Sequence, residues 1–425
     1  MSGTKKKMNS NRLFFALAVA GALGAAEAIE IVAPSEGETV RQHFPAQVEY
    51  LTKTLAERER YFDGAENARA MVRDGSRPMP IPVRWKDAAG AVRVTVRRLP
   101  DGKVFFSETV SATNGVSVNS LEIARSWELT AADGQSSASV RFRTEDLAPR
   151  LVRIAGVPNA RDLGGWKGLG GSRIRQGVFF RTSGLNDNPP WRYLPGAEVM
   201  RLDAEGKLET MDKDGIRLHV KIAHGEDFST NESVRVGFLD AKGAARLSDR
   251  ERRRVVEAFG FKVDLDLRRD AECARMTGSP LGEEVSWQRI SYQPYDLDSE
   301  EAKEANRRAF RVLFDAECHP VVFHCIGGAD RTGTVACLIE ALLGVCEDDL
   351  WKDYLATGFM GVVSNRGHHD MFAHLMYQLR KRYGNTLAER AKSYFLELGF
   401  SAAEIEAFRE RMLERGDLAE GAAAL

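Results

Sequence analysis

Two patterns of apolar residues divide the chain into a β-rich part and an α/β part. Across residues 80–148, apolar and polar residues alternate in short runs such as Val92–Val96, and turn sequences such as Asp101-Gly102 separate them. Several short strands at this spacing favour a small all-β sandwich over residues 80–148. Residues 29–79 precede it and contain a helical pattern around 46–61, so we interpret them as a helical lead segment.

From residue 150 onward, short apolar strands alternate with segments of helical period. Lys262–Leu267 is a candidate strand, and Glu300–Phe314 and Thr334–Leu343 are candidate helices. This alternation favours an α/β domain over residues 150–418, with a central, mostly parallel sheet flanked by helices. Residues 186–243 interrupt the alternation with a β pattern of their own. We interpret them as an insertion, either a flap beside a functional site or a surface excursion.

The first 28 residues have the pattern of a secretory signal peptide. Lys5–Lys7 form a basic start, Leu13–Leu23 form an apolar core that is short for a membrane span, and Ala26-Glu27-Ala28 is typical of a cleavage site. We therefore predict that residues 1–28 are removed after Ala28, which implies an exported protein, periplasmic or secreted. We expect no transmembrane segment after this cleavage, because no other run is long and apolar enough.

Charge and cysteine content narrow the class of protein. The 425 residues include 60 basic and 61 acidic side chains, a formal net charge of −1, so a general nucleic-acid-binding surface is not expected. The cysteines are odd in number and clustered in the C-terminal half, which fits an enzyme with a working thiol better than a disulfide framework. They are Cys273, Cys318, Cys325, Cys337 and Cys346.

One stretch carries recognisable chemistry. Residues Val321–Thr334 read VVFHCIGGADRTGT, in which an apolar strand delivers Cys325 into a glycine-bearing loop and a helix follows. The short loop must curl under the helix N-terminus, so backbone N–H groups and the helix dipole point at one small volume that suits a phosphate. Arg331 can bind two phosphate oxygens, and the same positive field favours the thiolate of Cys325. A nucleophile in a phosphate cradle indicates phosphoryl transfer through a cysteinyl-phosphate.

This stretch resembles the signature loop of cysteine-dependent protein tyrosine phosphatases. Asp330 immediately before Arg331, followed by Thr-Gly, is similar to the bacterial tyrosine/serine protein phosphatase family. The resemblance implies a protein tyrosine phosphatase-like α/β fold and hydrolysis of phosphomonoesters. It covers roughly residues 150–415, and the further segments that carry it are Asn159–Gly165, Gly177–Ser183 and Asp264–Arg268. Asp353-Tyr354 and the end helix near Ile405 also fit.

The predicted sandwich resembles a fibronectin type III module. Trp85 lies near its start, and Phe142 and Thr144 lie near its end. Its sequence carries no catalytic pattern. We expect it to act as a spacer or to dock a partner whose nature the sequence does not indicate.

The loop chemistry and the resemblance together assign roles to individual residues. Cys325 is the expected nucleophile, Arg331 is expected to bind the phosphate and stabilise the transition state, and Thr332 is expected to hydrogen-bond the cysteine sulfur. Backbone N–H groups from Ile326 onward would complete the cradle, and His324 would brace the loop rather than act as a base. The residues expected around the substrate, with Asp162 and Arg268 as braces, are Ile326, Gly327, Gly328, Ala329, His324, Arg161, Asp162 and Arg268.

The leaving oxygen needs a proton, and two sources for it remain open. The resemblance assigns this role to Asp330 inside the loop. Asp296 and Asp298 lie upstream in a stretch suited to a mobile loop, and many tyrosine phosphatases use such an upstream aspartate. We favour Asp330, and the geometry of the folded site decides between them.

One residue, Ala329, departs from the related sequences and bears on the substrate class. They commonly carry a lysine at the position of Ala329, and that lysine is associated with multiply phosphorylated lipid or inositol substrates. Its absence favours phosphotyrosine or another monophosphate, with phosphoserine and phosphothreonine as further protein substrates. A phosphoinositide or inositol-phosphate phosphatase is the alternative, since Arg161, Arg268 or Arg269 could supply the missing charge. A catalytically inactive phosphate-binding or adhesion module is the second alternative.

We expect no metal or other cofactor. His368, His369 and His374 lie close together in the sequence, but they have no suitably spaced carboxylate and do not form the pattern of a metal site. The thiol mechanism also requires no metal.

Overall fold

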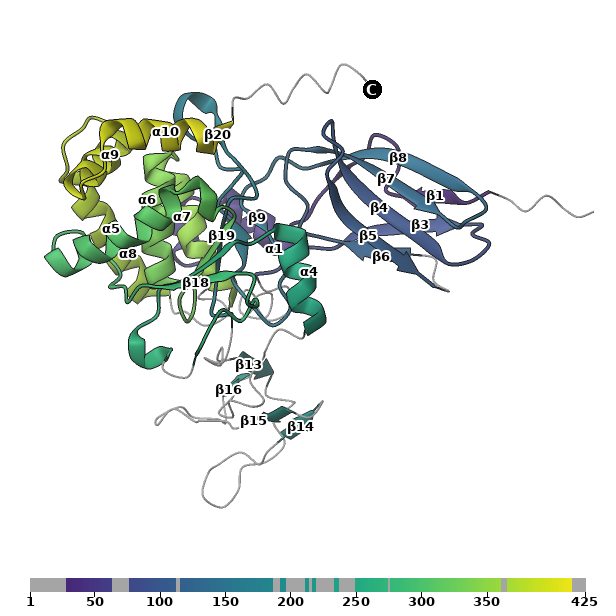
Figure 1. The fold of residues 1–425 in the computed structure, drawn as a ribbon, viewed down its shortest axis with the longest axis horizontal. Coiled ribbons are helices and arrows are strands. Elements are labelled where there is room, and N and C mark those ends of the chain that lie inside the picture. Colours follow the sequence, from purple (N-terminus) through teal and green to yellow (C-terminus); the bar gives the residue numbers. More distant parts are fainter. Residues whose placement is uncertain are drawn as a thin grey trace, which may run out of the picture.

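A β-rich part and an α/β part lie side by side in the computed structural model (Figure 1). The structure describes residues 28–62, 76–111, 115–185, 249–273, 276–360 and 365–414, together with four short strands between residues 192 and 236. Apart from Ala28, the predicted signal peptide lies outside the described residues, as does most of the predicted insertion. The four short strands form two antiparallel pairs, β13 (Arg192–Pro195) with β16 (Ser233–Val236) and β14 (Met211–Lys213) with β15 (Ile216–Leu218).

A six-stranded sheet forms the centre of the α/β part. Its strand order is β18 (Ser286–Arg289), β17 (Val263–Asp266), β19 (Val321–His324), β12 (Phe179–Thr182), β10 (Arg161–Asp162) and β9 (Arg150–Leu151). The first four strands run parallel to one another, and the last two pair antiparallel. Strands β17, β19 and β12 are buried along their whole length, as expected for parallel strands covered on both faces. The predicted α/β domain with a mostly parallel sheet is confirmed.

Helices cover both faces of this sheet, because successive strand residues point to opposite sides. On one face, Phe179 and Phe323 join a large core formed with six helices. On the other face, Phe180 and Val322 pack towards α4 (Asp249–Phe259). The six helices are α5 (Glu300–Phe314), α6 (Asp330–Leu342), α7 (Glu347–Leu355), α8 (Asn365–Arg380), α9 (Leu387–Glu397) and α10 (Ala402–Met412).

Two small sheets make up the β-rich part. The alternation of apolar and polar residues that predicted its strands appears as alternating burial along β3 and β7, and Trp85 and Trp127 lie in the core between the sheets. One sheet has the order β1 (Glu30–Ala33), β3 (Ile81–Lys86), β6 (Gly115–Val118). The other has the order β2 (Thr39–Val40), β8 (Ser137–Thr144), β7 (Ser126–Ala132), β4 (Val92–Leu99), β5 (Val104–Val110).

The lead segment differs from the predicted helical segment. Strands β1 and β2 lie within it and pair with β3 and β8, so the β-rich part begins at about residue 30 rather than at 80. The single helix expected around 46–61 is divided into α1 (Pro45–Thr52) and α2 (Leu55–Arg58). The reason is local, because the Thr54 side chain caps a new helix together with Glu57.

The lead helices pack against the α/β part, although sequence neighbours on both sides belong to the sandwich. The Tyr50 hydroxyl donates to the backbone oxygen of Lys352 at 2.8 Å, and Arg58 pairs with Asp348. The Phe62 and Phe359 rings meet edge to face with centroids 5.0 Å apart. The chain therefore crosses from sandwich to α/β part twice, and the two parts share one interleaved chain path.

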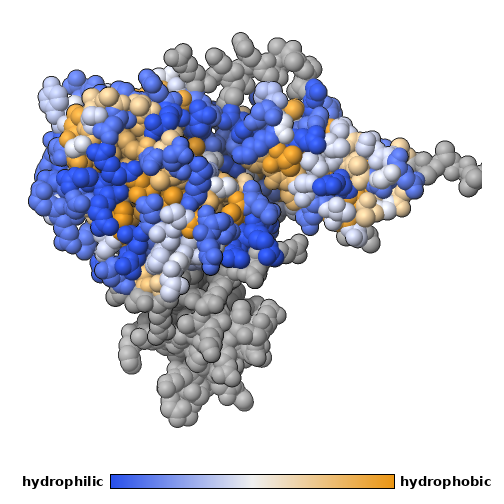
Figure 2. Space-filling model, in the orientation of Figure 1, coloured by the Kyte–Doolittle hydropathy of each residue, from blue (hydrophilic) through white to orange (hydrophobic). Residues whose placement is uncertain are grey.

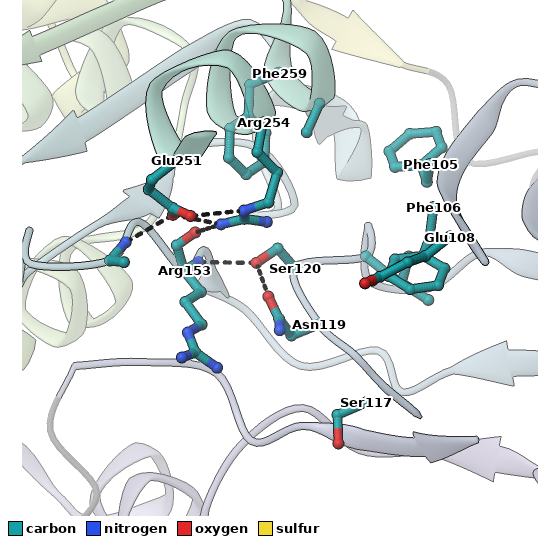
Figure 3. A pocket seen from close by; sticks show the side chains of 13 residues that line it. Phe105, Phe106, Glu108, Ser117, Asn119, Ser120, Arg153, Glu251, Arg254 and Phe259 are labelled. Atoms are coloured by element: carbon teal, nitrogen blue, oxygen red, sulfur yellow. Dashed lines mark hydrogen bonds and ion pairs between the residues drawn. The ribbon is translucent and has the colours of Figure 1, made fainter. Parts of the chain in front are cut away.

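A cleft of about 220 Å³ lies along the seam between β5, β6 and α4 (Figure 3). Figure 2 shows apolar residues reaching the surface near the junction of the two parts, on a surface that is mostly hydrophilic elsewhere. Below the cleft, the Arg153 backbone N–H donates to Ser120 Oγ at 2.8 Å, and Arg254 donates to the Arg153 carbonyl at 3.1 Å. The first bond joins the two parts, and the second ties Arg153 to α4 within the α/β part.

Among the described residues, no helix combines the length and the apolar character needed to cross a bilayer.

Truncation of Phe62 tests whether the lead helices stabilise the α/β part. The exposed fraction of Phe62 is 9%, and its ring packs on Phe359 and on Gly358. We expect Phe62→Ala to lower the free energy of unfolding by about 3 to 5 kcal/mol. Thermal melting checks this. Leu396→Ala, at a side chain that is 45% exposed, is the control expected to change little, and equal melting of both variants would contradict the prediction.

Candidate active site

The predicted loop connects the carboxyl end of β19 to the N-terminus of α6, between the neighbouring strands β17 and β12. Parallel α/β sheets place their ligand sites at this edge. Helix α6 begins at Asp330, one turn earlier than the sequence pattern predicted, so Arg331 and Thr332 lie in its first turn. Cys325 directly follows the strand, and its exposed fraction is 2%.

The carbonyl groups of four consecutive loop residues all bond to the surrounding protein. Cys325 O contacts His324 Nδ1 at 3.2 Å, and Ile326 O accepts from Gly184 N at 2.9 Å. The next two carbonyls accept from Asn159 Nδ2 at 3.1 and 3.0 Å, and the second of them also accepts from Arg181 Nη2 at 2.7 Å. In a planar trans peptide the N–H group points away from the carbonyl.

The N–H groups of the same peptides therefore face the opposite side of the loop. They belong to Ile326, Gly327, Gly328 and Ala329, and none of them donates to another residue in the described ranges. The first N–H groups of α6 add to them, because a helix leaves these donors without a partner in its own backbone. The loop thus presents a concave set of donors, which is the arrangement that binds a small anion.

Gly328 is required by the close approach of the loop to β12. Its φ is +66°, and a Cβ atom there would lie 2.3 Å from Thr182 O. A side chain would meet both a left-handed backbone and an adjacent carbonyl, so only glycine fits.

Arg331 is held next to the loop by Glu272, in the turn that follows β17. Arg331 Nη1 and Nη2 donate to the Glu272 carboxylate at 2.6 and 3.1 Å, and Nη1 also contacts Leu267 O at 3.3 Å. Burial lowers the pKa of Arg331, but Glu272 and the nearby Cys325 sulfur raise it, and the net shift is upward. The guanidinium is therefore a fixed positive charge beside the cysteine, oriented before any substrate arrives.

The comparisons with known proteins agree with this geometry. The sequence matches the model of the tyrosine phosphatase family over residues 152–193 and 228–414, more than half of the chain. The chain belongs to the tyrosine phosphatase family. The residues between the two matched ranges lie within the predicted insertion. The family match does not include the sandwich.

One curated relative is a protein of Cupriavidus necator named "Putative tyrosine-protein phosphatase". It is 27% identical over 201 residues, which are 47% of this chain. This chain spans 60% of the relative's length.

His324 lies behind the phosphatase loop between two buried aspartates. Its Nε2 is 2.9 Å from Asp264 Oδ1, and its Nδ1 is 4.0 Å from Asp266 Oδ1. Burial lowers the pKa of His324, but both carboxylates raise it, and the net direction is upward. A protonated ring can donate to Cys325 O, which lies 3.2 Å from His324 Nδ1, and the bracing role of His324 stays a prediction.

Arg268 and Arg161 are buried and already occupied. Arg268 donates to Asp266 Oδ1 and Oδ2 at 2.8 and 2.6 Å, so it reaches the loop only through that aspartate and His324. Arg161 Nε donates to Asp353 Oδ1 at 2.6 Å, and its guanidinium also contacts Asn159. Neither arginine is placed to replace the charge that Ala329 lacks.

Two predicted contacts are not made in this structure. Asp162 pairs with Arg150 at 2.8 Å and accepts from Gly164 N, so it braces the neighbouring strands instead of the loop. Thr332 Oγ1 is buried and forms no hydrogen bond with the Cys325 sulfur or with any other atom of the described residues. Thr332 is the third residue of α6, in the first turn of that helix.

The three candidate acids have different surroundings. Asp330 Oδ1 accepts a hydrogen bond from the Tyr295 hydroxyl, at the mouth of the loop. Asp296 Oδ1 accepts from the backbone N–H groups of Asp298 and Ser299 at 2.9 and 3.0 Å, at the start of α5. Burial raises the pKa of Asp296, but these bonds lower it, and the net shift is downward. Asp298 is exposed and pairs with Arg382 at 2.7 Å. Asp330 as the general acid therefore stays a prediction, with Asp296 and Asp298 as its alternatives.

Several residues of the site were missed by the sequence reasoning. Glu272 follows the central strand in an Arg-Arg-Asp-Ala-Glu run, where any of its charged residues could have been the partner of Arg331. Tyr295 had no polar pattern that could have identified it, and Tyr354 lies in a segment that fits the family but was given no role. The others are Asn159, Arg181, Asp264, Asp266 and Asp353, which the quoted family segments contain or adjoin.

The histidines and cysteines named in the sequence analysis have the following surroundings. No group of three or more possible metal ligands occurs within the residues that the structure describes. His369 pairs with Glu59 at 2.6 Å and stacks on Trp351, while the side chain of His368 lies outside the described set. All five cysteines are free thiols.

Substitution of Gly328 tests the required shape of the loop. We expect Gly328→Ala to reduce hydrolysis of any phosphomonoester substrate by about a hundredfold or more. The added Cβ would clash with Thr182 O and push the loop peptides away, so that their N–H groups no longer reach the phosphate oxygens. Steady-state kinetics checks this. Gly170→Ala is the matched control, because its φ is +63° but no atom lies within 4 Å of the added Cβ. Equal losses in both variants would show that backbone strain alone explains the effect.

The raised pKa of His324 predicts a pH-dependent contribution to stability. The protonated ring stabilises the fold fully below its ordinary pKa of 6.5, and this stabilisation is lost as the pH rises through the raised value. We expect His324→Asn to lower the free energy of unfolding most at low pH. The difference in free energy between the variant and the parent chain should shrink as the pH rises. Denaturant unfolding at a series of pH values measures this, and a gap that widens with pH would refute it.

Proposed function

We propose that this chain is an exported, cysteine-dependent phosphatase that hydrolyses phosphotyrosine monoesters, with phosphoserine and phosphothreonine as further substrates. The observation that carries the proposal is the loop whose carbonyls all bond outward, beside an arginine fixed by Glu272. An anion-binding cradle with a cysteine at its base is suited to nucleophilic attack on a bound phosphoryl group.

The proposed reaction has two steps. In the first, Cys325 Sγ attacks phosphorus, the bond from phosphorus to the ester oxygen breaks, and Asp330 gives its proton to the leaving oxygen. In the second, a water molecule attacks the cysteinyl-phosphate, Asp330 takes a proton from that water, and the thiolate leaves. Throughout, Arg331 and the loop N–H groups stabilise the charge on the phosphoryl oxygens.

Two observations support a monophosphate substrate over a phosphoinositide. Ala329 brings no charge to the loop, and Arg161 and Arg268 are buried in ion pairs that would have to break before either could bind a second phosphate. Breaking a buried ion pair costs several kcal/mol (about 3 to 5). Arg269 is exposed and is the remaining candidate for an additional phosphate, which a phosphoinositide substrate would require.

Export and docking are further parts of the proposal. The N-terminal sequence supports cleavage after Ala28, which the N-terminal mass of the protein recovered from the periplasm or medium would test. The cleft between the sandwich and α4 supports a docking role for the sandwich, because it combines aromatic side chains of β5 with Arg153 and Arg254 of the α/β part.

A substrate panel on the purified protein, with a chelator present, tests the proposed reaction. We expect turnover of phosphotyrosine peptides above phosphoinositides and inositol phosphates. Cys325→Ser should abolish turnover and keep phosphate binding, whereas Arg331→Ala should lose both. Acid quenching during turnover should trap phosphate on Cys325. Activity that needs added metal, or that survives in Cys325→Ser, would refute the thiol mechanism.

A further inference from the structure

Two buried tyrosines form a chain of hydroxyl groups that ends on Asp330. The Tyr295 hydroxyl donates to Asp330 Oδ1, and the Tyr354 hydroxyl lies within hydrogen-bonding distance of the Tyr295 hydroxyl. Tyr295 has one hydroxyl proton, which it gives to Asp330, so Tyr354 must be the donor to Tyr295. The two rings come from a loop before α5 and from α7, and their exposed fractions are 4% and 3%.

Tyr295 is held in this position by bonds at both its backbone N–H and its carbonyl. Its backbone N–H donates to Thr334 Oγ1 at 3.1 Å, and Thr334 in turn donates to the Asp330 carbonyl at 2.9 Å. Its carbonyl accepts from Gln378 Nε2, whose Oε1 accepts from Leu297 N at 2.8 Å. The φ angle of Tyr295 is +62°, which is unfavourable for a bulky residue. Such a conformation persists only where the surroundings fix it, and here it aims the ring at the loop.

Tyr354 is fixed by an equally close contact. Its ring stacks on Phe372 with centroids 4.0 Å apart, and it lies over Gly333 so closely that a Cβ there would be 2.9 Å from the ring. The glycine of the Arg-Thr-Gly sequence therefore makes room for Tyr354 on the first turn of α6. This contact brings the Tyr354 hydroxyl to the same side of α6 as Asp330.

We propose that Tyr295 positions Asp330 as the proton donor and that Tyr354 supports it in this task. The inference rests on the proposed phosphatase function and names residues that complete its acid. With Oδ1 accepting from Tyr295, the acidic proton is carried on Oδ2. When Asp330 gives that proton to the leaving oxygen, its charge rises, and the bond from Tyr295 becomes charge-assisted and stronger. The bond therefore stabilises the transition state of leaving-group departure more than the ground state.

The test compares kcat/KM for aryl and alkyl phosphates of graded leaving-group pKa. This ratio reports the steps up to leaving-group departure, which separates the acid role from hydrolysis of the intermediate. A general acid raises the rate about 10²- to 10⁴-fold. We expect Tyr295→Phe to lower kcat/KM roughly tenfold for substrates with poor leaving groups. For a good leaving group, which needs little protonation, the loss should be within about twofold.

The pH profile gives a second readout that a purely structural role would not move. A hydrogen bond to a carboxylate favours its ionised form, so removal of the Tyr295 hydroxyl should make Asp330 hold its proton to higher pH. The fall of kcat/KM on the alkaline side should therefore shift upward in Tyr295→Phe. Asp330→Asn is the reference variant, with a larger loss in the same direction across the leaving groups.

Tyr292→Phe is the matched control. Tyr292 lies three residues earlier in the same loop, is equally buried, and bonds through its hydroxyl to Asn306 rather than to the site. It should change neither the leaving-group dependence nor the pH profile. If Tyr295→Phe does not fold, Tyr354→Phe carries the test, because it removes the next hydroxyl in the chain and should give a smaller loss with the same dependence.

The outcomes separate this inference from the proposed function. Cys325-dependent turnover with a loss confined to poor leaving groups supports both. If Tyr295→Phe and Tyr354→Phe reduce turnover equally for all leaving groups, or do not reduce it, the proposed phosphatase function stands. The proposed role of the two tyrosines is then overturned. A protein that hydrolyses no phosphomonoester through Cys325 overturns the proposed function and this inference with it.

Discussion

The orientation of four peptide groups determines what the loop can do. Each carbonyl from Cys325 to Gly328 bonds to the surrounding protein, so the N–H groups of the following residues must face the other way. Unbonded N–H groups that converge on one point are unfavourable without an anion, since each is a strong donor left without a partner. The bonds on the outer side hold the loop in this shape. They make the cradle a property of the folded protein, available before a phosphate binds.

Those outer bonds depend on a buried ionic cluster behind the loop. Asp353 contacts both Arg161 and Arg181, and Arg181 in turn donates to Gly328 O. Burial raises the pKa of Asp353, but the two arginines lower it, so this carboxylate remains ionised. Burial also raises the pKa of nearby Glu340, which favours its neutral form. A buried pair of this kind adds little stability compared with apolar packing, but it fixes geometry, because breaking it leaves an unpaired charge in the interior. Its value to this protein is a rigid support for the cradle.

The sequence predicted those parts of the structure that depend on local pattern. The alternation of strands and helices after residue 150, and the strand-loop-helix around Cys325, follow from periodicity and from the glycines and arginine at fixed spacing. The partners of the key residues could not be predicted from local pattern, because they are distant in sequence. Glu272 lies 59 residues from Arg331, and Tyr295 lies 35 residues from Asp330. Asp353 lies 172 residues from Arg181, through which it supports the loop. Asp162 and Asp353 are both aspartates after strand or helix patterns, and only the fold decides that one braces Arg150 while the other braces the loop. The lead segment was misjudged for the same reason. Its short strands β1 and β2 find their partners in β3 and β8.

Helix α7 connects the lead segment to the chemistry of the loop. It carries Asp353, which supports the arginines behind the cradle, and Tyr354, which reaches Tyr295. On its other side, Tyr50 bonds to its backbone and Arg58 pairs with Asp348, while Phe62 packs on Gly358 just beyond its end. A displacement of the lead helices would therefore move both the cradle support and the tyrosine chain. The lead helices are joined to sandwich strands at both ends, so they connect the sandwich to the α/β part that contains the loop. The N-terminal part of this chain thus packs on the helix that carries Asp353 and Tyr354.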